Sequence, residues 1–160
     1  MEKKLSQTVE SLRKTHPSAE VEVWAEDEHR LGLQPVNRLI WVEKGEQPIA
    51  DVKVRFQWLW LVGFVHPMRG ETYWWLVPSL NTPVFSQVLA DFAQHFQLGA
   101  RKRVLLVVDG ATFHRSPKLK IPSGLDLIFL PPKSPELQPA ERLWPLTNEP
   151  IANRTFSNQG

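Results

Sequence analysis

The sequence contains no cysteine among its 160 residues. Disulfide bonds and thiolate metal sites are therefore excluded, and carboxylates and the five histidines remain as the strong metal ligands. No stretch approaches about 18 consecutive uncharged apolar residues, and the N-terminus lacks the apolar core of a signal peptide. We therefore expect a cytoplasmic protein with no membrane segment, and any metal it binds should be a hard cation.

A strong excess of charge of either sign is also missing. The formal net charge is +2, which permits a nucleic-acid partner without requiring one. Hydrophobic residues make up 42% and charged residues 22%, as in ordinary globular proteins, and the length fits a single domain. We predict a lead-in helix within residues 1–19 and one domain over residues 20–160.

Proline, in contrast, is concentrated in one place. Four prolines fall within nine residues, between a short apolar strand ending at Leu130 and a helix predicted to begin near Ala140; they are Pro131, Pro132, Pro135 and Pro139. Each proline fixes its own φ and so reduces the freedom of the unfolded chain. Such a loop determines where Glu141, in the first turn of the helix, points.

The segment from Glu20 to Glu28 alternates with the period of a strand, and Asp27 shares the apolar side with Val21, Val23 and Ala25. A carboxylate on a core-facing row is ionised only if a metal, an arginine or backbone donors compensate it. Glu26 and Glu28 point the other way, and we expect them to face solvent.

Further strands are predicted over residues 38–42, 54–65 and 72–77, which together form an antiparallel meander. The aromatic row of the longest strand, Phe56, Trp58, Trp60 and Phe64, could stack on bases but favours packing against a helix. That helix is predicted to start with Thr82 as its N-cap and Pro83 at its first position, and to end near Leu98.

Five aliphatic residues, Val104–Val108, predict a strand buried on both faces and parallel to a neighbour. Asp109 follows at the carboxyl end of that strand, the edge where α/β sheets bind ligands. Asp27, Asp109 and Glu141 could therefore converge on two divalent cations, an arrangement that clamps a phosphoryl displacement. Each acid taken alone is equally compatible with a turn or with a helix N-terminus.

Three segments carry a resemblance to a known family. Residues 24–28, 107–114 and 130–144 resemble the three acidic motifs of bacterial insertion-sequence transposases of the mariner type, which belong to the DDE superfamily. The resemblance implies an RNase H-like mixed sheet, an antiparallel three-stranded meander plus parallel strands, flanked by helices. It also implies that Asp27, Asp109 and Glu141 are the catalytic, metal-binding triad, with two Mg²⁺ ions for which Mn²⁺ can substitute.

Basic side chains cluster in the loops after two of the predicted strands. His114, Arg115, Lys118 and Lys133 are candidates for DNA contacts, although a basic loop is also a common form of solvated surface. For His114, a hydrogen bond that shapes its loop and a contact to a substrate phosphate are both open.

The expected partner is double-stranded DNA, both the element ends and the target. The sequence departs from the resemblance in having Gln138 where the family has asparagine, and no end-recognition helix-turn-helix precedes residue 20. A separate helix-turn-helix chain or a homodimer is therefore expected. Two alternatives are a non-enzymatic remnant or split-frame subunit that binds DNA or a partner transposase chain, and an RNase H-like nuclease acting on RNA–DNA hybrids or junctions.

Overall fold

The computed structural model describes residues 2–32, 41–45, 58–131 and 137–151. The elements in these ranges are, in chain order, α1 (Glu2–Thr15), β1 (Glu20–Gly32), β2 (Trp58–His66), β3 (Glu71–Val77), α2 (Thr82–His95), β4 (Lys102–Val108), β5 (Leu125–Phe129), the 3₁₀ turn η2 (Pro139–Leu143) and α3 (Trp144–Ile151). Within those ranges, every helix is too short or too polar to cross a membrane.

The strands form one five-stranded sheet in the order β3-β2-β1-β4-β5. Strands β1, β2 and β3 are antiparallel neighbours, whereas β4 runs parallel to both β1 and β5. The predicted combination of a meander with parallel strands is therefore confirmed. Strand β1 lies in the centre and joins the two halves of the sheet.

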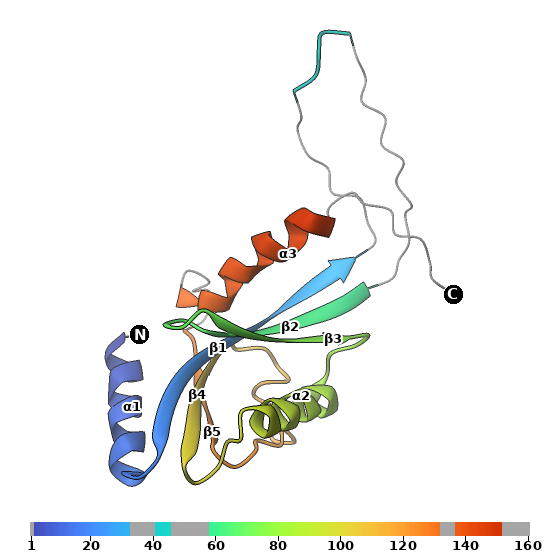
Figure 1. Ribbon diagram of the computed structural model, residues 1–160. Coiled ribbons are helices and arrows are strands. Elements are labelled where there is room, and N and C mark those ends of the chain that lie inside the picture. The colour runs from blue at the N-terminus through green and yellow to red at the C-terminus, as the bar shows by residue number, and fades with distance from the viewer. Residues whose placement is uncertain (1, 33–40, 46–57, 132–136, 152–160) are drawn as a thin grey trace.

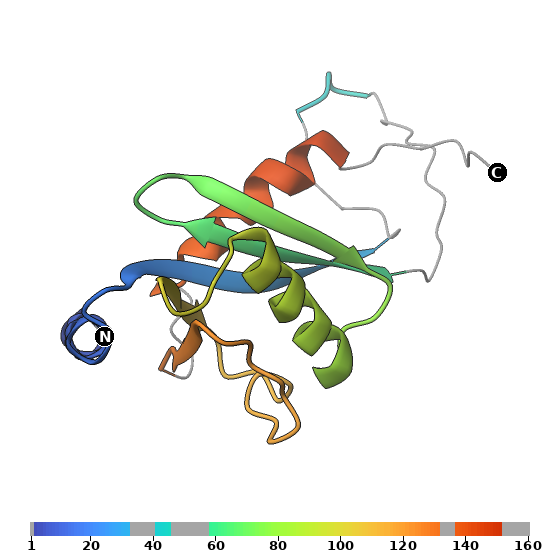
Figure 2. The ribbon, with the colours of Figure 1, turned by 60° about the horizontal axis from the view of Figure 1, so that its bottom comes forward.

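Helices cover both faces of the sheet, with α2 on one side and α3 on the other (Figures 1 and 2). Because neighbouring residues of a strand point to opposite faces, the apolar strand β4 contributes side chains to the hydrophobic cores on both faces of the sheet. The core under α2 includes Trp24, Phe64, Phe92, Val104 and Leu106. The core on the opposite face includes Ala25, Leu105, Ile128 and Ala140, with Leu5, Val9 and Leu12 of α1 packed against it.

The aromatic row of β2 packs against α2, as predicted. The ring of Phe64 stacks on that of Phe92 with 4.5 Å between centroids, and Trp60 is packed against the same cluster. Trp58 is more exposed and lies under the guanidinium of Arg30, 4.2 Å from the ring centroid. The remaining member of the row, Phe56, falls outside the described residues.

Some predicted boundaries differ from the observed ones. Strand β1 continues to Gly32, and β2 is described from Trp58, while residues 54–57 lie outside the described residues. Most of the strand predicted over residues 38–42 also lies outside them, and Trp41 and Val42, which are described, are not in a strand.

The N-cap of α2 is Asn81, not Thr82. The Asn81 side chain accepts a hydrogen bond of 3.0 Å from the backbone N–H of Val84, and its backbone is extended, as an N-cap requires. Thr82 therefore already belongs to the helix, and Pro83 takes the second position, where its missing N–H leaves no intrahelical bond unmade. The helix ends at His95, shortly before the predicted end at Leu98.

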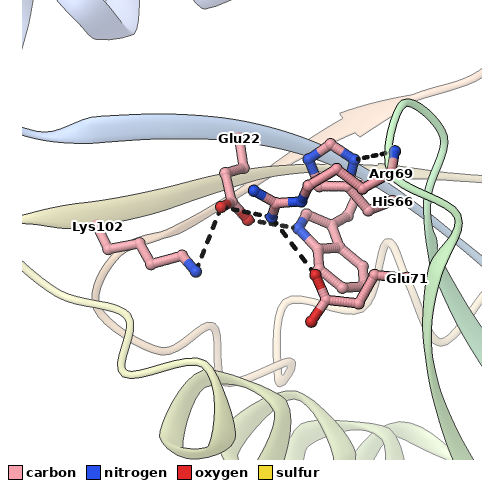
Figure 3. A network of polar contacts seen from close by, with 6 residues as sticks. Glu22, His66, Arg69, Glu71 and Lys102 are labelled. Atoms are coloured by element: carbon pink, nitrogen blue, oxygen red, sulfur yellow. Dashed lines mark hydrogen bonds and ion pairs between the residues drawn. The ribbon is translucent and has the colours of Figure 1, made fainter.

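A buried carboxylate ties the amino-terminal half of β1 to its neighbours (Figure 3). The side chain of Glu22 is 5% exposed, and it accepts hydrogen bonds from Trp24 Nε1 at 2.8 Å and Arg69 at 2.6 Å, with Lys102 Nζ at 3.3 Å. Burial alone would raise the pKa of Glu22, but these donors outweigh it and hold the pKa at about 2. Glu22 thereby links β1 to the β2–β3 turn and to β4.

Because the folded-state pKa of Glu22 is lowered from 4.5 to about 2, its contribution to stability is present above pH 4.5 and is lost as the pH falls toward 2. We expect Glu22→Gln to lower the free energy of unfolding at neutral pH by about 2 kcal/mol, less than the full pKa difference implies because Arg69 is half-exposed. Urea denaturation at several pH values measures the free energy of unfolding of wild type and of Glu22→Gln.

The difference in free energy of unfolding between wild type and Glu22→Gln should become smaller as the pH is lowered from 4.5 toward 2. Glu71→Gln is the matched control, since Glu71 lies 3.5 Å from the same arginine but is 45% exposed. A gap of unchanged size at low pH, or an equally large effect of Glu71→Gln, would contradict this account of Glu22.

Candidate metal centre

The register between β1 and β4 brings two of the predicted acids together. Ala25 of β1 pairs with Val107 of β4. Asp27 and Asp109 each lie two residues further along the backbone. Because the strands are parallel, equal steps along both reach the same level of the sheet, which is where β4 ends and β1 continues beside β2. Asp27 and Asp109 therefore lie at equivalent positions on two neighbouring backbone segments.

The third acid is brought to β1 by two hydrogen bonds that flank it. Gln138 Nε2 donates to the backbone carbonyl of Glu26 at 2.7 Å, and Trp144 Nε1 donates to Asp27 Oδ2 at 2.8 Å. Since Glu141 lies midway between Gln138 and Trp144, its turn is held on the strand that carries Asp27.

Glu141 lies in the 3₁₀ turn η2 and not in the α-helix predicted to begin near Ala140. The α-helix starts at Trp144, whose backbone N–H bonds to the carbonyl of Glu141, three residues back. Pro145 has no N–H to make the α-helical bond to that carbonyl. The proline thus keeps the segment around Glu141 in the tighter turn.

The charges of the three acids interact directly. Burial raises the pKa of Asp27, and the negative charges of Glu141 and Asp109 raise it further, against hydrogen bonds from Trp144 and from the backbone N–H of Glu28. Asp27, Asp109 and Glu141 offer carboxylate oxygens as ligands, and the charges of Glu141 and Asp109 act on Asp27. This donor set fits Mg²⁺ or Mn²⁺.

Asp109 is held by its own loop. Its Oδ1 atom accepts hydrogen bonds from the backbone N–H of Ala111 and from His114 Nδ1, both at 2.8 Å, while its side chain is 47% exposed. Within the described residues Oδ2 accepts no hydrogen bond. Asp109 therefore keeps one oxygen available for a cation.

His114 is fully buried, with its Nε2 atom 3.2 Å from Glu26 Oε2. Burial alone would lower the pKa of His114, but Glu26 and the charges of Glu28 and Asp109 raise it to about 9. In its protonated form the imidazole is a donor at both nitrogens. Of the two roles left open for His114, the structure shows the loop hydrogen bond, because the buried ring does not reach the surface where a phosphate would lie.

The expectation that Glu26 and Glu28 face solvent is wrong. Glu26 is 0% exposed, and Glu28 is partly buried with its pKa raised to about 8 by burial and by the charge of Glu26. Both point to the face that α2 and the loop after β4 cover, where Phe85 of α2 lies 4.6 Å from the ring of His114. The ligand atoms of Glu26, Glu28 and His114 lie within 4.8 Å of one another, across β1 from Asp27.

The basic candidates occupy different surroundings. Arg115 is exposed and lies over the ring of Phe129, 5.2 Å from its centroid, next to the Asp109 loop. Lys118 is exposed further along the same loop. Lys133 lies outside the described residues.

Comparison with known proteins adds to this geometry. The DDE superfamily endonuclease family matches residues 22–160, most of the sequence. The chain belongs to this family. One relative of this DDE superfamily protein is the uncharacterized protein y4pE/y4sA of Sinorhizobium fredii (strain NBRC 101917 / NGR234), which is 34% identical over 102 residues, 63% of this chain and 74% of the relative.

Solved structures of Mos1 transposase show the same fold. The Mos1 strand transfer complex matches with a TM-score of 0.64 at 15% identity, and the Mos1 mariner paired-end complex with Mn with a TM-score of 0.64 at 16% identity. Each match covers 96% of this chain and 48% or 49% of the Mos1 chain, so this DDE superfamily chain spans about half the length of Mos1. Its mixed sheet is the RNase H-like fold of a DDE transposase catalytic domain.

Sequence reasoning missed four residues of this centre: Glu26, His114 as a buried partner, Gln138 and Trp144. A usable signal for Glu26 was its position on the same side of β1 as Trp24, because the doubly buried β4 next to it implies that both faces are covered. The contacts of Gln138 and Trp144 to β1 join residues more than 100 positions apart and leave no local pattern.

We expect Trp144→Phe to lower the free energy of unfolding of this DDE superfamily protein by about 1–3 kcal/mol, because the partly buried carboxylate of Asp27 loses its donor. The phenyl ring retains most of the apolar packing, including the stack on His29. Chemical denaturation at neutral pH measures the loss. In an Asp27→Ala background the same substitution should cost much less, since the acceptor is already gone.

Trp74→Phe is the matched control, because Trp74 packs against Trp144 while its Nε1 donates to the exposed Thr72. It should change stability by less than about 0.5 kcal/mol. An equal cost of Trp144→Phe with and without Asp27 would show that this hydrogen bond does not stabilise the centre.

Proposed function

We propose that this chain is a transposase catalytic domain that cuts and joins DNA strands at the ends of an insertion sequence, using Mg²⁺ held by Asp27, Asp109 and Glu141. The observation that carries the proposal is the β1–β4 register, which sets Asp27 level with Asp109, together with the two hydrogen bonds that hold the turn of Glu141 on β1. Membership of the DDE superfamily and the Mos1-like fold support it. The proposed place of action is the bacterial cytoplasm.

The site's own residues orient the proposed ligands. Trp144 holds Asp27 by its Oδ2 atom, and Ala111 and His114 hold Asp109 by Oδ1, so that one oxygen of each carboxylate is directed by a donor. A pair of divalent cations in such a site activates the attacking oxygen and stabilises the leaving oxygen of an in-line displacement. The complexes of Mos1 that this fold resembles were solved with Mn and with Mg.

Two displacements make up the proposed reaction. In the first, water forms a bond to phosphorus at the element end, the bond from phosphorus to the 3′-oxygen breaks, and that oxygen takes up a proton. In the second, the freed 3′-hydroxyl attacks a target phosphodiester and loses its proton, while the target's own 3′-oxygen leaves. Each step exchanges one oxygen on phosphorus for another, by water in the first and by a 3′-hydroxyl in the second, so the same carboxylates could serve both.

We expect Asp109→Asn to lower Mg²⁺- or Mn²⁺-dependent nicking of element-end DNA by at least about 100-fold, because a neutral amide is a poor ligand for a hard cation. Nicking is measured on a gel with end-labelled duplex. Asp126→Asn is the matched control, since Asp126 pairs with Arg103 at 2.7 Å on β5 and takes no part in the triad.

Equal nicking by wild type and Asp109→Asn, or none by wild type, would contradict the proposed activity. DNA or partner binding without any metal dependence would instead support a non-enzymatic subunit. Faster cleavage of an RNA–DNA hybrid than of duplex element ends would support the RNase H-like nuclease.

We further propose that Arg115, Lys118 and Lys133 contact DNA phosphates. Arg115 and Lys118 are exposed next to the loop that carries Asp109, where a scissile strand would have to approach. Phosphate contacts by such side chains position the duplex without reading its sequence.

We expect Arg115→Gln, and equally Lys118→Gln, to weaken duplex binding uniformly across sequences and to reduce the slope of log affinity against log salt by about 0.9. Fluorescence anisotropy at several salt concentrations measures both effects. Arg101→Gln is the matched control, because Arg101 is exposed at the opposite end of β4. An unchanged salt slope in both variants would exclude the proposed phosphate contacts.

A further inference from the structure

Glu26 is connected to each of the three acids, either as its neighbour in the chain or through one intervening residue. It is the residue before Asp27 on β1, its side chain lies 3.2 Å from His114 Nε2, and its backbone carbonyl accepts the 2.7 Å hydrogen bond from Gln138. His114 in turn bonds to Asp109, and Gln138 opens the turn that carries Glu141. One buried residue thus connects the three chain segments that bear the acids.

We propose that Glu26 and His114 act as positioning residues that set the geometry of the triad: the Glu26 side chain fixes the ring of His114, and His114 fixes Asp109 with its Oδ2 atom free. This inference rests on the proposed function, because it concerns the same cations. Neither residue is proposed as a ligand.

The burial of the pair argues for this role over a purely stabilising one. Both Glu26 side-chain oxygens and His114 Nε2 are buried, and the 3.2 Å contact between Glu26 and His114 lacks hydrogen-bond geometry. Replacing a buried ion pair by apolar residues of similar size is often neutral or stabilising. The pair should then matter mainly through Asp109, as hydrogen-bond partners of metal ligands do.

The test compares two double variants of the full chain, Glu26→Leu/His114→Leu and Glu26→Leu/His114→Asn. Both remove the buried charge pair, but the asparagine amide can still donate to Asp109 from the place of Nδ1. Mn²⁺ affinity is measured by isothermal titration calorimetry, and stability by urea denaturation.

We expect the Leu/Leu variant to bind Mn²⁺ about 10–100-fold more weakly than wild type while remaining folded, and the Leu/Asn variant to recover most of the affinity. Wild-type affinity in the Leu/Leu variant, or no recovery in the Leu/Asn variant, would overturn the proposal. If the double variants do not fold, the single variants decide: His114→Asn should bind Mn²⁺ more tightly than His114→Gln, whose amide lies toward Glu26, and equal affinities would overturn the proposal.

A measurement without metal separates this inference from the proposed activity. The amide of Ala111 donates to the same Asp109 oxygen as His114 does, so its hydrogen exchange reports whether Asp109 is held. Exchange at Ala111 should be faster in His114→Gln than in His114→Asn, and equal rates would overturn the positioning role. Absence of Mn²⁺ binding by wild type would refute the proposed activity alone, since the exchange comparison still decides the role of His114.

Discussion

The parallel register of β1 with β4 is the constraint on which the rest of this molecule depends. It places Ala25 beside Val107, so that Asp109, just after the end of β4, lies level with Asp27 inside β1. The same pairing makes β1 the central strand, with an antiparallel meander on one side and parallel strands on the other. A shift of one residue would turn Asp27 to the other face of the sheet and separate it from Glu141.

The two faces of β1 make different contacts around Glu26 and Asp27. On one face Asp27 meets Trp144 and the turn bearing Glu141, and on the other Glu26 meets His114 beneath α2. Polar groups this deep are costly unless partners compensate them, and the partners here are all residues of the centre or of its supports. These buried polar groups therefore lie where the proposed metal ligands have to be oriented. The Glu22 network, at the other end of β1, only joins structural elements.

Pro145, which follows the proline-rich segment, shapes the turn that carries Glu141. The α-helical bond to the carbonyl of Glu141 is missing because Pro145 cannot donate it, and the chain stays in a 3₁₀ turn until Trp144. That turn is then fastened to β1 from both sides, by Gln138 and by Trp144. Glu141 is held by tertiary hydrogen bonds at its flanks and not by the regularity of a helix.

The sequence by itself determined the strand periods, the buried β4, the helix after Asn81 and the three acidic motifs, because alternation, aliphatic runs and proline spacing are local properties of the chain. From these the mixed sheet and the position of Asp109 at the end of β4 were predictable, whereas β1 runs past Asp27 to Gly32. The tertiary structure alone decided that Glu26 is buried, that His114 bonds to Asp109, and that Gln138 and Trp144 hold the turn of Glu141. Alternation in the sequence indicates which residues lie on the same face of a strand. Whether that face is exposed to solvent depends on the segments packed over it, which here are α2 and the loop after β4.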